Sequence, residues 1–329
     1  MKILFYHSTE FPQVQGRAAA KLFMPVADCL ANMGHTVGIV APRDCGAETL
    51  EMFAKAERVR HCVFTHLEPF LRSLPMTKPD LLVLFTDKPE QQRIAEKARG
   101  HGVKVLFSEL GFLPHYNSIY FDEEGCGPAS SLCRLIPKDG HTADIPKIHR
   151  DRGYVLVLLQ LEEDYNFRAS PFPSNSAFIA AVRHSFAGIP VKVRLHPAMG
   201  MEQPPLHEQL RECSCAVGLN TSALFECLKA GVPCYMLAEG PGRHSGAFLT
   251  DLKTTPFHAN LECPEWHLRH RRARMLLAEL LERRQIRLDR DVTPDILFGN
   301  AVLGAPLVAG VPADGEAEDD NGDNPCIAG

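Results

Sequence analysis

Apolar and polar positions divide the start of this chain into a strand, a helix and a second strand. Residues 1–6 and 35–40 are short apolar runs, and apolar residues recur at helical spacing over 17–33 between them. Gly34 follows the helical stretch, as is common where a helix ends. Two strands joined through a helix usually pair in parallel with a right-handed crossover, so this order predicts a parallel sheet.

The same alternation continues along the chain and predicts two domains. Apolar runs at 79–85 and 103–107 flank a helical stretch at 90–99, and the apolar run at 154–160 opens a second series. Further strands and helices are expected at 174–187, 191–195, 206–212, 217–219, 221–229, 232–237 and 266–287. We therefore expect an α/β protein with two Rossmann-like domains, whose parallel sheets face each other across a cleft.

Changes in composition set the expected domain boundaries. Residues 137–152 are polar and rich in charge, which indicates a linker between a domain at 1–150 and a domain at 151–300. Residues 301–329 are rich in Gly, Ala, Pro, Asp, Glu and Asn, so we expect a disordered tail there. The polar stretch 113–131 is expected to be a long loop with a short hairpin, and loops of this length are often functional.

Overall composition excludes several classes of protein. The 329 residues are 45% hydrophobic and 23% charged, which suits a globular chain of two domains. The net charge of −5 argues against general nucleic-acid binding. The 11 cysteines are scattered without zinc-like spacing, which predicts free thiols in a reducing compartment. No apolar run approaches the roughly 20 residues of a membrane span, so we expect a cytoplasmic protein that touches the inner membrane at most peripherally.

Two strand ends in the second half carry residues suited to an anion. The strand at 191–195 ends in His196 and Pro197, and proline cannot donate to a strand ladder. The helix at 221–229 opens on Asn220, Thr221 and Ser222, whose side chains can satisfy free N–H groups at a helix start. Such N–H groups and the helix dipole also attract anions. An imidazole beside a hydroxyl-lined helix start predicts a phosphate site.

Charged residues near other strand ends are weaker candidates. Glu109 follows a strand of the first half and is either a surface residue before a turn or a group that projects into the cleft. Arg194 shares a strand face with His196 and suits either charge neutralisation or an internal ion pair. The acidic run 162–164 is more typical of a solvated strand end than of a metal site, because hard-metal ligands come from spaced positions. The basic cluster at 267–274 is interpreted first as a solvated helix face, and otherwise as contact with an anionic acceptor or membrane.

These motifs resemble those of a known group of enzymes. Glu109-Leu-Gly111, His196-Pro197 and Asn220-Thr-Ser222 resemble the D/E-D-G, His-Pro and Ser/Thr series of CMP-sugar transferases. The segments 120–125, 130–131, 154–162 and 224–233 are most similar to those of the bacterial Kdo transferases of capsule and lipopolysaccharide synthesis. The resemblance covers most of residues 100–240. It implies a GT-B fold and transfer of Kdo or a related nonulosonic acid from a CMP donor to a growing cell-surface polysaccharide or lipid-linked acceptor, with no metal and no cofactor required.

The resemblance also implies roles for individual residues. Glu109 would be the catalytic carboxylate, and His196 would hold the CMP phosphate and help it depart, with Thr221 and Ser222 on the same phosphate. The other candidates at the nucleotide site are Arg194, Pro197, Asn220 and Glu226, and the candidate donor or acceptor contacts are Gly111, Gln160 and Glu162.

One departure from the pattern leaves alternatives open. Leu110 stands where the motif has its middle Asp, so the identity of the acting carboxylate, and activity itself, stay undecided. One alternative is a transferase of the same fold that uses a UDP- or GDP-sugar, with Glu226 at the ribose. Another is a non-catalytic protein of polysaccharide synthesis or export.

Overall fold

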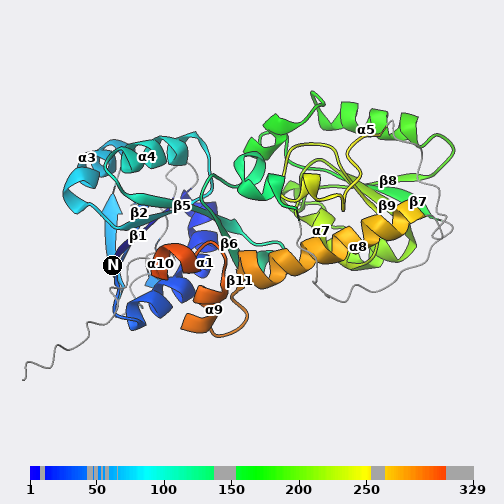
Figure 1. The fold of residues 1–329 in the computed structure, drawn as a ribbon. Coiled ribbons are helices and arrows are strands. Elements are labelled where there is room, and N and C mark those ends of the chain that lie inside the picture. Colours follow the sequence, from blue (N-terminus) through cyan, green and yellow to red (C-terminus); the bar gives the residue numbers. More distant parts are fainter. Residues whose placement is uncertain are drawn as a thin grey trace, which may run out of the picture.

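The protein is an α/β molecule with two sheets, each covered by helices (Figure 1). The computed structural model describes residues 1–7, 12–42, 47, 51–52, 55, 59–64, 66–136, 153–252 and 264–308. Within these residues, a seven-stranded sheet has the order β11-β6-β5-β4-β1-β2-β3, and a four-stranded sheet has the order β10-β9-β7-β8. The predicted fold class, two Rossmann-like domains with parallel sheets, is confirmed.

The first domain is built on the larger sheet. Its parallel strands are β1 (Lys2–Tyr6), β2 (Thr36–Pro42), β3 (Arg60–Phe64), β4 (Leu81–Phe85) and β5 (Lys104–Leu110). The strand β6 (Ser118–Asp122) runs antiparallel to β5 and forms the hairpin expected within 113–131. Among the described residues before 137, this sheet is accompanied by the helices α1 (Pro12–Asn32), α3 (Leu67–Thr77) and α4 (Pro89–Gly100).

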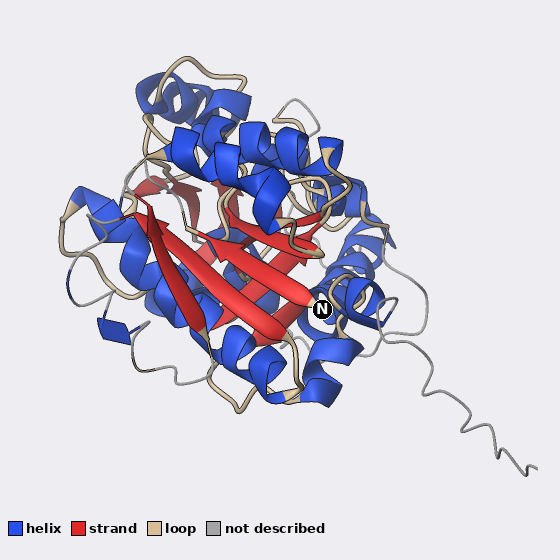
Figure 2. Ribbon diagram, turned by 90° about the vertical axis from the view of Figure 1, so that its left-hand side faces the viewer, coloured by secondary structure: helices blue, strands red, loops and turns tan. Residues whose placement is uncertain are grey.

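Helices cover both faces of this sheet because strand side chains alternate between its faces (Figure 2). In β1, the Phe5 ring packs on Phe23 of α1 with centroids 4.9 Å apart. The next residue, Tyr6, points the other way and stacks on Phe70 of α3 at 4.7 Å. A strand buried on both sides must be apolar throughout, which explains the unbroken apolar runs in the sequence.

The second domain has a wholly parallel sheet. Its strands are β7 (Tyr154–Leu158), β8 (Val191–Arg194), β9 (Cys213–Gly218) and β10 (Cys234–Met236). Its helices are α5 (Asn175–Ser185), α6 (Leu206–Gln209), α7 (Ala223–Lys229) and α8 (Pro264–Glu279). Along β7, Val155 and Val157 cluster with Phe178 of α5, whereas Leu156 and Leu158 cluster with Leu224 of α7.

The chain returns to the first domain after α8, which corrects the expected boundary at residue 300. The strand β11 (Gln285–Arg287), predicted as helix, pairs antiparallel with β6 (Figure 1). The helices α9 (Pro294–Gly299) and α10 (Gly304–Val308) belong to the same apolar cluster as α1. Leu303 and Leu307 are fully buried, so the tail prediction is wrong for residues 301–308. Residues 309–329 and most of the expected linker lie outside the described residues.

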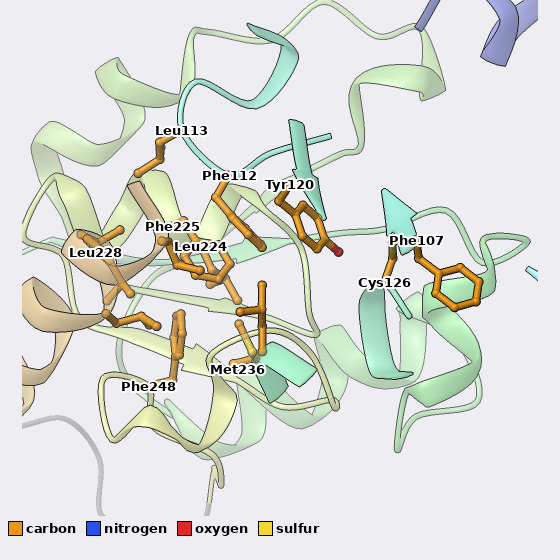
Figure 3. Packing of buried hydrophobic residues seen from close by; sticks show 14 of the residues in the cluster. Phe107, Phe112, Leu113, Tyr120, Cys126, Leu224, Phe225, Leu228, Met236 and Phe248 are labelled. Carbon is orange, nitrogen blue, oxygen red and sulfur yellow. The ribbon is translucent and has the colours of Figure 1, made fainter. Parts of the chain in front are cut away.

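A continuous apolar cluster joins the two domains. Phe112, which follows β5, lies between Tyr120 of β6 at 4.8 Å and Phe225 of α7 at 4.6 Å, measured between ring centroids (Figure 3). The backbone N–H of Gly242 also donates to the carbonyl of Leu132 across the domains at 2.7 Å. These contacts hold the loop after β5 against the start of α7.

Two further findings concern the state of the cysteine side chains and the length and polarity of the helices. The seven cysteines whose side chains the structure describes are buried free thiols. In the described ranges, no helix combines the length and apolar character needed to cross a bilayer.

Candidate active site

Two adjoining cavities lie where the carboxyl ends of the strands of both sheets meet. Their volumes are about 280 Å³ and about 290 Å³. The first, which we call the β8 cavity, contains Arg194 and Glu226; the second, the β5 cavity, contains Glu109. Four side chains line both cavities and form the neck between them: His115, His196, Thr221 and Ser222. The structure therefore brings the predicted carboxylate, imidazole and hydroxyls into one connected space.

The β8 cavity is apolar on its walls and charged at its edges. Its apolar residues include Leu158, Leu159, Leu195 and Leu206. Arg194 Nη1 donates to the Pro204 carbonyl and to Gln209 Oε1, both at 2.6 Å. Partial burial raises the pKa of Glu226, against the lowering effect of Arg194, Lys229 and His207. The partners of Arg194 are neutral oxygens, so its bonds are not the internal ion pair considered from the sequence, and charge neutralisation by Arg194 stays a prediction.

His196 is oriented by the turn that follows β8. The N–H of Ala198 donates to His196 Nδ1 at 3.2 Å, so the neutral ring carries its hydrogen on Nε2. Burial lowers the pKa of His196, and nearby Asp164 raises it in part. Pro197 starts the turn and lines the β8 cavity. The ring therefore reaches the neck as a half-buried, neutral N–H donor.

Thr221 and Ser222 lie immediately before α7, as the sequence predicts. Thr221 Oγ1 accepts the N–H of Ala223 at 3.4 Å, which is a weak cap. Asn220 donates through Nδ2 to the carbonyls of Asn166 and Glu239, at 3.2 Å and 2.8 Å, and so ties two loops together. The two hydroxyl side chains are only partly buried and line the neck.

His115 completes the neck from the first domain, and the sequence analysis did not single it out. Its Nδ1 lies 2.7 Å from the carbonyl of Gly111, and a carbonyl can only accept, so Nδ1 carries the hydrogen. Its Nε2 lies 3.4 Å from Ser222 Oγ. Burial and the neighbouring His196 lower the pKa of His115. A histidine in the long polar loop after β5 was the available signal.

Glu109 projects into the β5 cavity from the end of β5. Its Oε1 accepts the N–H of Leu110 at 2.9 Å. Burial, assisted by the negative charges of Asp87 and Asp164, raises the pKa of Glu109 to about 7. A carboxyl group with this pKa exchanges a proton near neutrality, as a general base or acid must. Leu110, which replaces the motif's Asp, lines the same cavity.

Two further carboxylates, Asp122 and Asp87, accept hydrogen bonds from the loop that follows β6. Asp122, fully buried at the end of β6, accepts hydrogen bonds from the backbone or side chains of Glu124, Gly125, Ser130 and Ser131. These bonds hold the loop after β6 in place. The loop includes the segments 120–125 and 130–131, which resemble those of the Kdo transferases.

Asp87 follows β4 and is the second of these carboxylates. It accepts the N–H of Cys126 at 2.8 Å, and burial raises its pKa to about 7, with a smaller contribution from Asp122. The preceding residue, Thr86, has a φ of 66°, a left-handed conformation that is strained for a β-branched residue. Asp87 was also missed, although it follows an apolar run just as Glu109 does.

Amide side chains complete the β5 cavity. Gln160, Asn166 and Asn220 line it, and within the described residues no hydrogen-bond donor reaches any of their side-chain oxygens. Asp164 is the member of the acidic run that lines the cavity. Amide side chains can both donate and accept hydrogen bonds, so residues of this type in the lining suit a ligand with hydroxyl groups.

Two predicted contacts lie outside both cavities. Gly111 packs against Ser118, where a Cβ atom would come within 2.1 Å of Ser118 Oγ, and its carbonyl orients His115. Glu162 accepts the N–H of Asn175 at the start of α5 at 2.6 Å. Both residues thus have structural roles in this conformation.

The described part of the chain was compared with the ligand sets that hold metal ions. Among the residues that the structure describes, no group of three or more His, Cys, Asp or Glu side chains is arranged to hold a metal ion.

The basic residues at 267–274 lie on α8, where Arg269 donates to the carbonyl of Phe248 at 3.1 Å.

Comparison with known proteins places the fold. No protein-family model matches the sequence, and no curated protein matches it. A solved structure of Thermosulfurimonas dismutans KpsC, described as a beta Kdo 2,7 transferase, is 13% identical and superposes with a TM-score of 0.51 over 87% of this chain and 92% of that one. A second KpsC structure from this organism, a beta Kdo 2,4 transferase, is 15% identical with a TM-score of 0.47 over 76% and 91%. A putative UDP-N-acetylglucosamine 2-epimerase from Listeria monocytogenes is 14% identical with a TM-score of 0.37 over 85% and 91%. The chain therefore has a GT-B fold like that of the first KpsC structure.

Proposed function

We propose that this protein is a glycosyltransferase that moves Kdo or a related nonulosonic acid from a CMP-activated donor. The observation that carries the proposal is the neck, where His196, Thr221 and Ser222 separate an apolar-walled cavity from a cavity that contains Glu109. A nucleotide-sugar has the same three parts in the same order: a nucleoside, a phosphate and a sugar.

The three parts of the donor can be assigned to the three parts of the site. The nucleoside would occupy the β8 cavity, between the leucine side chains and the Arg194–Glu226 edge. The phosphate would lie at the neck, within reach of the His196 Nε2–H and the two hydroxyl groups. The sugar would lie in the β5 cavity, whose lining includes the amide side chains of Gln160 and Asn166.

The chemistry requires donors at the leaving group and a carboxylate near the anomeric carbon. Preorganised hydrogen-bond donors stabilise the charge that builds up on a departing phosphate. Glu109 would either deprotonate the acceptor hydroxyl in a single displacement or attack the sugar and form a covalent intermediate. In both routes Glu109 must be ionised to act, and its pKa near 7 lets it be so at neutral pH. The route decides whether the anomeric configuration is inverted or retained.

The acceptor would be a hydroxyl group of a growing cell-surface polysaccharide or a lipid-linked glycan. It must approach Glu109 through the β5 cavity, since the β8 cavity holds the nucleotide in this assignment. The KpsC neighbour supports this choice of acceptor only through its fold. The proposal needs no metal or cofactor, because imidazole, hydroxyl and guanidinium groups face the donor.

A UDP- or GDP-sugar is the second candidate donor. The observation in its favour is Glu226, which lines the β8 cavity in the first turn of α7. A carboxylate there can accept hydrogen bonds from ribose hydroxyl groups of any nucleotide. The same fold without activity, in a protein of polysaccharide synthesis or export, is the non-catalytic alternative that Leu110 invites.

Thermal unfolding of the full chain with CMP, UDP or GDP separates the nucleotide candidates. We expect CMP to raise the melting temperature more than UDP or GDP. The His196→Ala variant should lose most of the CMP effect, whereas His184→Ala, an exposed change on α5, should keep it. Stabilisation by UDP or GDP and not by CMP would refute the CMP donor.

Catalysis is tested with Glu109→Gln. This variant should bind CMP as the wild type does, but should neither transfer nor hydrolyse a CMP-activated acidic sugar. Equal turnover by the variant and the wild type would remove Glu109 from the reaction.

A further inference from the structure

The described lining of the two cavities has more acidic than basic side chains, which disfavours an anionic ligand. Among the lining residues that the structure describes, the fully ionised side chains are three carboxylates, Glu109, Asp164 and Glu226, and one guanidinium, Arg194. The Arg194 guanidinium also donates to the Pro204 carbonyl and to Gln209 Oε1. A phosphate at the neck would therefore meet no permanent positive charge of the first domain within this lining. The phosphate of a CMP-activated sugar is a diester with one negative charge, and an acidic sugar adds its carboxylate. The described lining favours such an anion only if it also takes up a proton.

The structure indicates which group takes up that proton. Glu109 and Asp164 face the sugar side of the neck, Glu226 and Arg194 face the nucleoside side, and His196 faces the neck from the β8 turn. His196 already presents Nε2–H in its neutral form, because Nδ1 accepts from Ala198. His115 is different, since its single hydrogen is held on Nδ1 by the carbonyl of Gly111. Its Nε2 therefore carries no hydrogen and is an acceptor at the neck, 3.4 Å from Ser222 Oγ.

A bare imidazole nitrogen and a phosphate oxygen are both acceptors and repel each other. A proton on Nε2 removes this repulsion and creates a charge-assisted hydrogen bond. The Gly111 carbonyl still accepts from Nδ1–H in the doubly protonated ring, so no reorientation is needed. The ring is also held in place, because Phe112 packs on Phe225 and brings the loop of the first domain against the start of α7.

We propose that His115 is a second imidazole of the phosphate site, which takes up a proton when the phosphate of the donor binds and donates it to the leaving phosphate during transfer. This inference rests on the proposed function. In a single displacement, the bond between the anomeric carbon and the phosphate oxygen breaks, and its electron pair stays on that oxygen. The His115 Nε2 proton passes to the same oxygen. The acceptor oxygen forms the new bond to the anomeric carbon, and its proton goes to Glu109.

The proposal explains why the phosphate would be contacted from both domains. His196, Thr221 and Ser222 belong to the second domain, and His115 belongs to the first. Departure of the phosphate would then be assisted only when the two domains are packed as they are here. A protein that binds the nucleotide with the second domain alone would not protonate His115.

Nitrogen NMR of the histidine rings in the full chain, labelled with ¹⁵N-histidine, tests the proposal directly. At pH 7.5 the free protein should show His115 with a hydrogen on Nδ1 and a bare Nε2. Saturating CMP should convert this ring to the doubly protonated form, whereas cytidine, which lacks the phosphate, should leave it neutral. The His115→Gln variant assigns the signals, and His184→Gln serves as the matched control, since it should remove a different ring and leave CMP binding unchanged.

Binding measurements complete the test. His115→Gln should weaken CMP on the order of tenfold or more and change cytidine little, as expected for the loss of a charge-assisted hydrogen bond. CMP that binds to the wild type while the His115 ring stays neutral would overturn this inference and leave the proposed function standing. Absence of CMP binding to the wild type would instead overturn the proposed donor, and this inference with it.

Discussion

Gln285 is the residue through which the C-terminal part of the chain holds the site loop. It is 5% exposed on β11, and its Oε1 accepts the N–H groups of Phe112 at 2.9 Å and Leu113 at 3.3 Å. Its Nε2 donates to the carbonyl of Leu113 at 2.5 Å. The Gln285→Leu change keeps a similar volume but leaves these backbone groups without partners.

The expected loss of stability follows from the two shorter bonds. An unsatisfied buried polar group costs about 1–3 kcal/mol, and Phe112 and Leu113 are each 5% exposed. Loss of partners for the Phe112 N–H and the Leu113 carbonyl should therefore lower the free energy of unfolding by about 2–6 kcal/mol. That is a large part of the roughly 5–15 kcal/mol that stabilises a typical protein.

Urea unfolding followed by far-ultraviolet circular dichroism measures this loss. Arg287→Ala, at the end of the same strand, is the matched control. Arg287 pairs with Asp289 at the surface, with its side chain 39% exposed, so its removal should change the unfolding free energy by only about 0.5 kcal/mol. A Gln285→Leu variant within about 1 kcal/mol of this control would refute the argument, because the loop would not depend on β11.

Two further predictions concern the C-terminus and the buried carboxylates. A chain ending at Asn300 lacks the buried side chains of Leu303 and Leu307. Its free energy of unfolding should be about 3–6 kcal/mol lower than that of a chain ending at Val308. Equal urea midpoints for the two chains would contradict the packing of α10. Burial, with a smaller effect of Asp122, raises the pKa of Asp87 from 3.8 to about 7. The folded state therefore binds this proton more tightly than the unfolded chain. The contribution of Asp87 to stability should fall as pH rises from about 4 to about 7 and level off above. Asp87→Asn does not titrate, so its stability relative to the wild type should improve over this interval, and a difference independent of pH would show that Asp87 is ionised in the folded protein.

Sequence patterns located the strand ends that build the site, because apolar periodicity is a local property. The runs at 103–107 and 191–195 correspond to β5 and β8, and Glu109 and His196 follow them into a shared space. In an open α/β sheet, residues at the carboxyl ends of parallel strands lie on one edge. Applied to two sheets that face each other across a cleft, this rule predicts that Glu109 on one side meets His196, Thr221 and Ser222 on the other.

His115 and Asp87 carry less sequence signal. His115 lies in a polar loop, where nothing in the neighbouring residues says which side chain turns toward the other domain. Asp87 follows an apolar run, so a systematic search of strand ends would have found it. Its effect on Glu109 depends on the neighbouring positions of β4 and β5 in the sheet.

The alternation of apolar and polar residues by itself determined the α/β class and the positions of most strand ends, since each strand and helix requires only neighbours in the chain to be recognised. The roles of the residues at those ends were predicted from their chemistry and from the motif resemblance. Only the tertiary structure decided that 285–308 belongs to the first domain, that Gln285 holds the loop after β5, and that His115 reaches Ser222. These contacts join residues more than 100 positions apart, and they depend on how the Phe112 and Phe225 rings pack, which no local pattern encodes.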